Sequence, residues 1–405
     1  MNSPLNQPPH KSLNEPLGKS LNEPLGKSLN EPLGKSLNEP LGKSLNEPLG
    51  VAVVGAGFMG GVHAEVFAEH PRARLAAVCD LDRGAARELA GRFAVETVTD
   101  DLDSVLSDDR IGLVVVTTPN ALHAEQAARA LRAGRHVLVE KPLALTSDEI
   151  RGLLRLADER GLVLAHGSNF VHSPKFRRVR ELVADADAFG RPHLARVVVR
   201  NGGPDSGWCL DPALAGGGVL LDLGCHAVEI CRWLLGGAEV RAVTARSQRV
   251  RPRAGRVEDQ ATLLLEFADG ALGQCDVSWA CPGGEEITTE VLGTSGRAGA
   301  DLWAGMGVHA FSERGFASVW EPNQGWVRPE WEWVRASGYT HQDHAVVEAV
   351  LDGTPLPHSA VEAWTSARVL EAAAESAATG RTVELAPSPN GHPVPDAVRG
   401  GDRVH

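Results

Sequence analysis

The chain has 405 residues, a hydrophobic content of 43%, a charged content of 23% and a formal net charge of −12. This length exceeds what one compact core usually holds, so we expect two folded domains. The five Lys and five Glu of the first 50 residues cancel, which leaves the negative charge on residues 51–405. Such an acidic body excludes bulk-charge binding to nucleic acid or to anionic membranes.

Residues 11–50 are five perfect copies of the octapeptide KSLNEPLG. Each copy contains one proline, one glycine and only two leucines, so it cannot bury an apolar face, and its period matches no solenoid. We interpret residues 1–50 as a disordered or loosely extended tail, with partner binding as the alternative.

Apolar strands alternate with helical segments from Val51 onward. The predicted strands are Val51–Val54, Leu75–Cys79, Leu113–Val116, His136–Val139 and Leu162–Ala165. Helices are predicted between them, as an amphipathic stretch to His70, at Arg83–Arg92, at Ala121–Arg132 and from the capping box at Thr146–Glu149 to about Arg160. Residues 51–170 are therefore predicted to form a doubly wound parallel sheet with both faces covered.

The pattern changes after residue 170. A helix near Lys175–Ala184 is followed by predicted strands at His193–Arg200, Val240–Gln248, Gln260–Phe267, Leu272–Trp279 and Ile287–Leu292. Asp269-Gly270 indicates a hairpin turn, and Ser359–Glu362 caps a last helix that Gly380 ends. Residues 171–385 are predicted to form an α+β domain with a mostly antiparallel sheet, and the Pro- and Gly-rich residues 386–405 a flexible tail.

Gly55-Ala56-Gly57-Phe58-Met59-Gly60 follows the first strand and opens a helix, the context in which this glycine pattern indicates dinucleotide binding. Gly55 allows a tight turn, Gly57 lets the backbone approach the pyrophosphate, and Gly60 permits close helix–strand packing. Asp80, at the end of the second strand, is placed to bind the ribose hydroxyls and to repel a 2′-phosphate. This favours NAD, with NADP and a ligand-free turn as alternatives.

Two further clusters carry ionisable groups. Glu140-Lys141-Pro142 follows a strand of the same sheet, although alone it would be interpreted as a surface turn. Asp222 and His226 lie one turn apart if the residues from Val219 are helical. Ionisable groups on an otherwise apolar helix need partners or a function, and a helix-stabilising Asp222 with a core His226 is the alternative.

In this order the motifs resemble the Gfo/Idh/MocA family, which includes glucose–fructose oxidoreductase and inositol dehydrogenase, from Val51 to about Leu385. The matching segments also include Thr118-Pro119-Asn120 with His123, Gly217-Gly218, Gly224 and Thr379-Gly380-Arg381-Thr382-Val383. The resemblance implies a Rossmann domain, a second domain with a large open sheet, and a cis Lys141–Pro142 peptide. The residues expected beside the cofactor are Gly55, Gly57, Phe58, Met59, Gly60, Asp80, Thr118, Pro119, Asn120, His123, Glu140 and Lys141.

The resemblance also implies that Lys141, Asp222 and His226 form the catalytic group. His226 is assigned as the general base for the hydroxyl proton, because an imidazole titrates near neutral pH. Lys141 donates a hydrogen bond to the same oxygen and stabilises its developing negative charge, and the alternative is a desolvated lysine with a lowered pKa that shares the proton transfer. Asp222 holds and polarises the pair.

The substrate is predicted to contact Lys141, Asp222, His226, Asn169, His172, Trp208 and Tyr339. Trp208 suits the apolar face of a sugar ring and plain packing equally. His341 and His344 suggest a metal ion by their spacing, but no third ligand follows, and we interpret them as a helix start. No metal site is predicted, and the six cysteines are interpreted as reduced thiols of a cytoplasmic enzyme. No stretch approaches the roughly 20 apolar residues that span a bilayer, and no export signal is evident.

We therefore predict an NAD(P)-dependent oxidoreductase that moves a hydride to or from a hydroxyl-bearing carbon of a sugar, nucleotide sugar or cyclitol. Alternatives are an NAD-dependent glycosidase that uses a transient oxidation, and a cofactor-binding regulator without catalysis. The expected partners are a small polyol or sugar and, in a homodimer or homotetramer, other copies of the chain. The open sheet is the predicted interface, with which the apolar alternation in Leu263–Trp279 is compatible.

Overall fold

The computed structural model describes residues 47–204, 206–251, 255–281, 285–303, 308–312, 325–327 and 338–387. Of the predicted tails at residues 1–50 and 386–405, residues 1–46 and 388–405 lie outside these residues.

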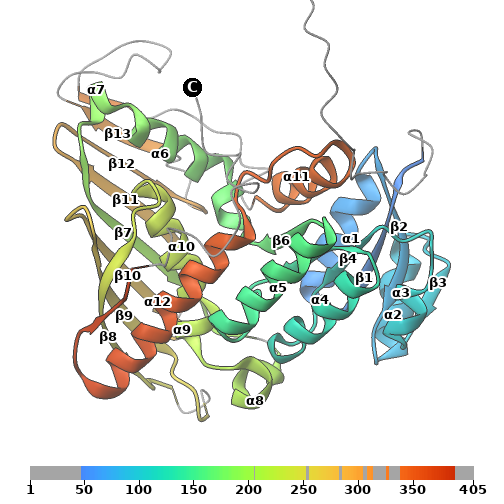
Figure 1. The fold of residues 1–405 in the computed structure, drawn as a ribbon. Helices are drawn as coiled ribbons and strands as arrows, with labels where there is room; N and C mark the ends of the chain where they lie inside the picture. Colours follow the sequence, from blue (N-terminus) through green and yellow to red (C-terminus); the bar gives the residue numbers. More distant parts are fainter. Residues whose placement is uncertain are drawn as a thin grey trace, which may run out of the picture. The chain divides into compact units, whose positions relative to one another are not determined.

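Six parallel strands form the first sheet in the order β3-β2-β1-β4-β5-β6 (Figure 1). They are β1 Leu49–Val54, β2 Ala73–Cys79, β3 Thr97–Thr99, β4 Leu113–Val116, β5 His136–Glu140 and β6 Leu164–Gly167. The helices between them are α1 Phe58–Glu69, α2 Arg83–Arg92, α3 Leu102–Leu106, α4 His123–Arg132 and α5 Ser147–Arg160. The doubly wound prediction is confirmed, and the strand order reverses between β1 and β4, where such sheets bind ligands.

Several strand boundaries differ from the prediction by one or two residues, and pairing with neighbouring strands explains those of β1 and β6. β1 begins at Leu49, inside the last octapeptide copy, because Leu49 and Gly50 already pair with Ala73 and Arg74 of β2. β6 begins at Leu164, the first residue in register with β5.

A nine-stranded sheet follows in the order β14-β13-β12-β11-β7-β10-β9-β8-β15. Its strands are β7 Pro192–Arg200, β8 Val240–Gln248, β9 Gln260–Phe267, β10 Leu272–Ser278, β11 Glu286–Gly293, β12 Gly296–Asp301, β13 Val308–Ser312, β14 Gly325–Val327 and β15 Val383–Glu384. The sheet is mostly antiparallel, as predicted, but β7 and β10 run parallel, so it is a mixed sheet.

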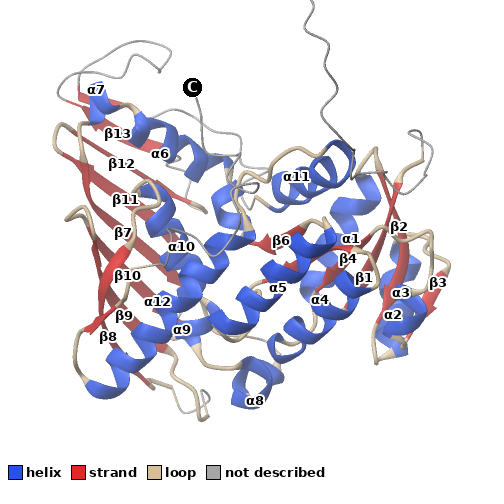
Figure 2. Ribbon diagram, in the orientation of Figure 1, coloured by secondary structure: helices blue, strands red, loops and turns tan. Residues whose placement is uncertain are grey.

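Helices pack on the face of this sheet that is turned toward the Rossmann sheet (Figure 2). They are α6 Pro174–Ala184, α10 Gly224–Leu234 and α12 Ala360–Thr379, while the shorter α7 Ala186–Phe189, α8 Pro212–Ala215 and α9 Val219–Asp222 lie in the connections. Leu263, Leu265 and Phe267 of β9 point into this apolar core. One side of the alternation therefore fills the core, while Leu264 and Leu272, 36% and 40% exposed, lie on the opposite face, and the oligomer interface stays a prediction.

The opposite face of the sheet also carries ion pairs between neighbouring strands. Arg196 binds Glu290 at 2.9 Å, and Arg200 binds Asp276 at 2.8 Å. Pairing of opposite charges between neighbouring strands stabilises a solvated sheet face.

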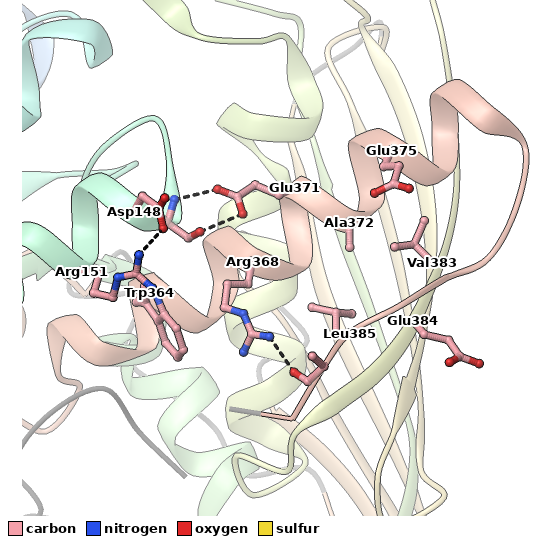
Figure 3. Close-up of a pocket in the computed structure, with 12 residues that line it drawn as sticks. Asp148, Arg151, Trp364, Arg368, Glu371, Ala372, Glu375, Val383, Glu384 and Leu385 are labelled. Carbon is pink, nitrogen blue, oxygen red and sulfur yellow. Dashed lines mark hydrogen bonds and ion pairs between the residues drawn. The ribbon is translucent and has the colours of Figure 1, made fainter. Parts of the chain in front are cut away.

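Helix α12 joins the two halves of the fold. Ala360, Ala363 and Trp364 belong to a core beside the Rossmann sheet, whereas Val369 and Leu370 belong to the core of the second sheet. Glu371 accepts hydrogen bonds from the Ser147 N–H and hydroxyl at 2.7 and 2.8 Å, at the start of α5. A cavity of about 350 Å³ lies between α5, α12 and β15, with Glu371 on its wall (Figure 3).

One segment corrects the expectation that no stretch is apolar enough to span a membrane. Pro212–Leu234 meets that criterion by length and composition, but 72% of its apolar window is buried inside the fold.

All six cysteines are free.

Candidate active site

The Gly-rich loop joins β1 to α1, and each of its glycines is required for a different structural reason. Gly55 has φ +105°, and its carbonyl oxygen accepts a hydrogen bond from the Thr117 hydroxyl at 2.7 Å. A Cβ at Gly60 would overlap that carbonyl oxygen, so only glycine lets α1 pack on the turn. A Cβ at Gly57 would meet nothing within 4 Å. Gly57 thus leaves open space where a pyrophosphate approaches this motif.

Asp80 lies at the carboxyl end of β2 and fixes the Gly-rich loop by a hydrogen bond. Its Oδ2 accepts the Ala56 N–H at 2.6 Å, and its Oδ1 accepts the Asp82 N–H at 2.8 Å. Phe58 and Leu81 are each 86% exposed beside this carboxylate and the loop. Apolar surface and a carboxylate at this edge fit the adenosine end of a dinucleotide.

Replacing Gly57 with valine is expected to weaken NAD binding at least about tenfold without lowering the thermal midpoint, because the side chain fills only open space. Gly60→Ala is the control, and it should lower the midpoint because its Cβ overlaps the Gly55 carbonyl. Calorimetric titration and thermal unfolding measure the two effects. Unchanged NAD affinity in Gly57→Val would place the pyrophosphate elsewhere.

Lys141 and Asp222, which come from separate motifs, form an ion pair. Lys141 directly follows β5, and its peptide bond to Pro142 is cis, as the resemblance implied. Lys141 Nζ donates to Asp222 Oδ1 at 2.5 Å and to the Asp222 carbonyl oxygen at 3.3 Å. The two side chains are 18% and 31% exposed, so the ion pair borders solvent. A strand end of the Rossmann sheet thus meets the end of α9.

The pKa of Lys141 is raised, which rules out the alternative of a lysine with a lowered pKa that shares the proton. Burial lowers this pKa, but nearby charges, that of Asp222 first, and the Asp222 hydrogen bond together raise it above its ordinary value. Burial likewise raises the pKa of Asp222, while Lys141 and Trp279 bring it below its ordinary value. At neutral pH the pair is therefore an ammonium and a carboxylate, and Lys141 is a fixed positive charge.

His226 lies in α10, which does not continue α9 directly. The predicted single helix is interrupted at Leu223, because α9 ends at Asp222 and α10 begins at Gly224. The His226 ring packs on Phe170 with 4.5 Å between ring centroids. Burial, followed by the charge of Lys141, lowers the pKa of His226 to about 3. The imidazole is therefore neutral at pH 7, but this lowered pKa differs from the near-neutral titration that we predicted and makes the ring a weaker base.

Trp279 is a residue of this cluster that we did not predict. It directly follows β10, and its Nε1 donates to Asp222 Oδ2 at 3.0 Å. The two carboxylate oxygens are thus divided between Trp279 and Lys141. An indole N–H buried at a strand end was indistinguishable in the sequence from a core tryptophan.

Trp279→Phe is expected to lower kcat about tenfold and to leave NAD affinity unchanged, because it removes one charge-assisted hydrogen bond from Asp222. Trp303→Phe, at a tryptophan that is 37% exposed, is the matched control. Steady-state kinetics and NAD titration distinguish the variants. Equal kcat values in both would show that the indole only fills space.

Residues predicted beside the cofactor also connect loops. Asn120 donates to the Ala215 carbonyl at 2.9 Å, which ties the loop after β4 to α8. The His123 ring nitrogens lie 2.7 Å from the carbonyl oxygens of Pro142 and Thr118. His123 therefore sets the spacing between the loop that contains Pro119 and the loop that contains Lys141.

The predicted substrate residues differ in accessibility. Asn169 and His172 are buried in the 3₁₀ helix Asn169–His172, as His226 is in α10, so burial does not distinguish them from the proposed base. Tyr339 opens α11 (Tyr339–Asp352), and its hydroxyl lies 3.8 Å from Met59 Sδ in the Gly-rich motif. Trp208 is half-buried in the 3₁₀ helix Gly207–Leu210.

The 3₁₀ helix that contains Trp208 lies close enough to the ion pair for the charge of Asp222 to act on the thiol of Cys209, the next residue. Burial, followed by that charge, raises the pKa of Cys209 to about 11. Within the described part of the chain, no three His, Cys, Asp or Glu side chains form a group that could hold a metal ion.

Comparison with known proteins agrees with this geometry. Residues 49–168 match the oxidoreductase family with an NAD-binding Rossmann fold, and residues 176–299 match the GFO/IDH/MocA C-terminal domain. The chain therefore belongs to the Gfo/Idh/MocA family of oxidoreductases, and NAD is its cofactor. The open space over Gly57 and the carboxylate of Asp80 fit that cofactor.

Three relatives illustrate the similarity. GenD2 from gentamicin A biosynthesis, solved with NAD, is 56% identical with a TM-score of 0.76, covering 86% of this chain and 99% of GenD2. Levoglucosan dehydrogenase, solved with NADH and levoglucosan, is 26% identical with a TM-score of 0.74, covering 84% and 99%. Inositol 2-dehydrogenase of Rubrobacter xylanophilus is 32% identical over 280 residues, which span 68% of this chain and 77% of the relative.

Proposed function

We propose that this enzyme transfers a hydride between NAD and a secondary hydroxyl-bearing carbon of a sugar or cyclitol ring. The observation that carries the proposal is the Lys141–Asp222 ion pair, which borders solvent at the end of β5. The pair places an ammonium and a carboxylate at the edge of the sheet that binds the dinucleotide, and the charges of both act on the neutral His226. Removing a hydride from an alcohol needs such a base and such a charge.

Each group has a separate role in this proposal. Bound NAD supplies the hydride acceptor. A ring nitrogen of His226 accepts the hydroxyl proton, because the ring is neutral before the reaction. The lowered pKa weakens this base, so the proton transfer depends on the oxygen charge that Lys141 stabilises. Lys141 Nζ donates a hydrogen bond to the same oxygen and stabilises its developing negative charge. Asp222 Oδ1 fixes the ammonium, and Trp279 fixes Asp222 through the other oxygen.

Charge and relatives support an amino sugar as the substrate class. The chain has a net charge of −12, which favours the approach of a cationic ligand over an anionic nucleotide sugar. GenD2, which is 56% identical, comes from gentamicin A biosynthesis. We therefore rank amino-substituted sugars and aminocyclitol glycosides above neutral polyols.

Absorbance of reduced nicotinamide tests this function. Purified enzyme and NAD are mixed with aminocyclitol glycosides, free amino sugars, neutral sugars, inositols and nucleotide sugars, each at low and high salt. We expect NADH to form fastest with a cationic glycoside, and high salt to raise KM for that substrate. NADH formation only with neutral polyols would overturn the amino-sugar assignment. A silent panel with cofactor-replete enzyme would contradict the dehydrogenase itself.

A further inference from the structure

A buried ionic triad lies behind the catalytic ion pair and has no part in the reaction described above. His63 of α1 is fully buried. Its Nδ1 lies 2.8 Å from Asp343 Oδ2 of α11, and its Nε2 lies 3.0 Å from Glu140 Oε1 at the end of β5. Both partners are carboxylates that accept hydrogen bonds, so only a doubly protonated ring donates to both.

The electrostatics agree with this geometry. Burial lowers the pKa of His63, but the charges and hydrogen bonds of Asp343 and Glu140 raise it to about 10. Burial raises the pKa of Glu140, and His63 brings it below its ordinary value. At neutral pH His63 is therefore an imidazolium beside the Glu140 carboxylate, and its other ring nitrogen faces Asp343.

Glu140 is also the immediate neighbour of the catalytic lysine. Glu140 Oε2 accepts the Lys141 backbone N–H at 2.9 Å, while its Oε1 is taken by His63. Glu140 and Asp222 both attract the Lys141 ammonium. Each Glu140 oxygen thus has a donor other than the ammonium, which lies 2.5 Å from Asp222 Oδ1.

We propose that His63 is a positioning residue for Lys141: it holds the Glu140 carboxylate in the interior and leaves the lysine ammonium to Asp222 and the substrate oxygen. Asp343 fixes the His63 ring from the other side. The same helix α11 places Tyr339 edge-on to His63, with 5.8 Å between ring centroids. Docking of α11 on α1 is thereby coupled to the position of Lys141. This inference rests on the proposed function, in which Lys141 acts on the substrate oxygen.

A double-variant cycle tests this role. His63→Gln removes the cation and leaves Glu140 a free buried anion beside Lys141, so kcat per NAD-binding site is expected to fall about 100-fold. NAD affinity should change by less than about threefold. Glu140→Gln removes the competing charge, so the double variant should recover at least about tenfold of the lost kcat. Normalisation to titrated NAD sites excludes unfolded molecules from the comparison.

His70→Gln is the matched control for the single variant. His70 follows α1 and also contacts α11, with 4.2 Å between its ring centroid and that of His344, but no carboxylate among the described residues forms an ion pair with it. The substitution is the same on the same pair of helices, and we expect kcat to stay within about threefold of the parent. A loss in His70→Gln as large as in His63→Gln would make the effect one of helix docking only.

The outcomes separate this inference from the proposed function. An unchanged kcat in His63→Gln, or additive losses in the double variant, overturns the positioning role while wild-type turnover stands. If the wild type itself turns over no substrate, imidazole ¹⁵N spectra at pH 8.5 still test the triad. A doubly protonated His63 that becomes neutral in Glu140→Gln supports the ionic arrangement, and a neutral His63 in the parent enzyme overturns it.

Discussion

Replacing Lys141 with methionine is expected to lower kcat about 100- to 1000-fold while NAD still binds. Methionine keeps the length of the side chain but removes the charge that stabilises the substrate oxygen in the transition state. Asp222 loses its ammonium partner as well, although it keeps the hydrogen bond from Trp279. Steady-state kinetics at saturating NAD, with calorimetric titration of NAD, measure both parts of the prediction.

Lys141→Arg is the informative companion variant. It keeps the charge but puts a planar guanidinium where a compact ammonium lies 2.5 Å from Asp222, so activity should be partial at best. A kcat within about threefold of the parent in Lys141→Met would exclude a role for this ammonium in the chemistry.

The second large effect is expected for His226→Gln, which should lower kcat about 100- to 10,000-fold because it removes the proton acceptor. Glutamine keeps hydrogen-bonding capacity in a similar volume. Thermal unfolding and NAD titration serve as controls that the fold and the cofactor site remain. Activity near that of the parent would assign the base to another group.

The pH dependence follows from the direction of the His226 shift. Because its pKa is lowered from 6.5 to about 3, the free enzyme carries a neutral base above pH 6.5 and well below it. The kcat/KM profile of the parent enzyme should therefore show no acidic limb near pH 6.5. A limb at that pH would mean that the imidazole titrates as it does in water.

The same shift has a consequence for stability. The unfolded imidazole binds a proton below pH 6.5, whereas the folded one binds it only near pH 3. The stability that His226 contributes is thus fully present above pH 6.5 and is lost as the pH falls toward 3. Urea unfolding between pH 7 and pH 4 should show a smaller loss of stability in His226→Gln than in the parent.

Chemical labelling of lysine amino groups gives an independent check on the charge of Lys141. Among residues 51–405, Lys141 and Lys175 are the lysines of the chain. Lys175 is buried, and its Nζ donates to the carbonyl oxygens of Asp301 and Leu302. Amine labelling read by peptide mass should therefore be slow at both lysines, because Asp222 holds Lys141 as an ammonium and Lys175 is buried.

Local sequence by itself determined the Rossmann domain and its cofactor motif. The apolar runs and the glycines at 55, 57 and 60 act within one strand–turn–helix unit, so spacing along the chain is enough to predict them. The capping box at Thr146 and the stop at Gly380 are of the same kind, and the structure confirms both. Resemblance to a family then supplied the pairing of Lys141 with Asp222.

Only the tertiary structure decided which ionisable groups form hydrogen bonds and ion pairs and so shift one another's pKa. Trp279 reaches Asp222 from a strand 57 residues further on, and Asp343 reaches His63 across 280 residues. The raised pKa of Lys141 depends on Asp222, 81 residues away, and the direction of the β9 side chains depends on which face of the sheet the helices cover. Burial and charge act through space, so residue spacing along the chain carries no record of these pairings.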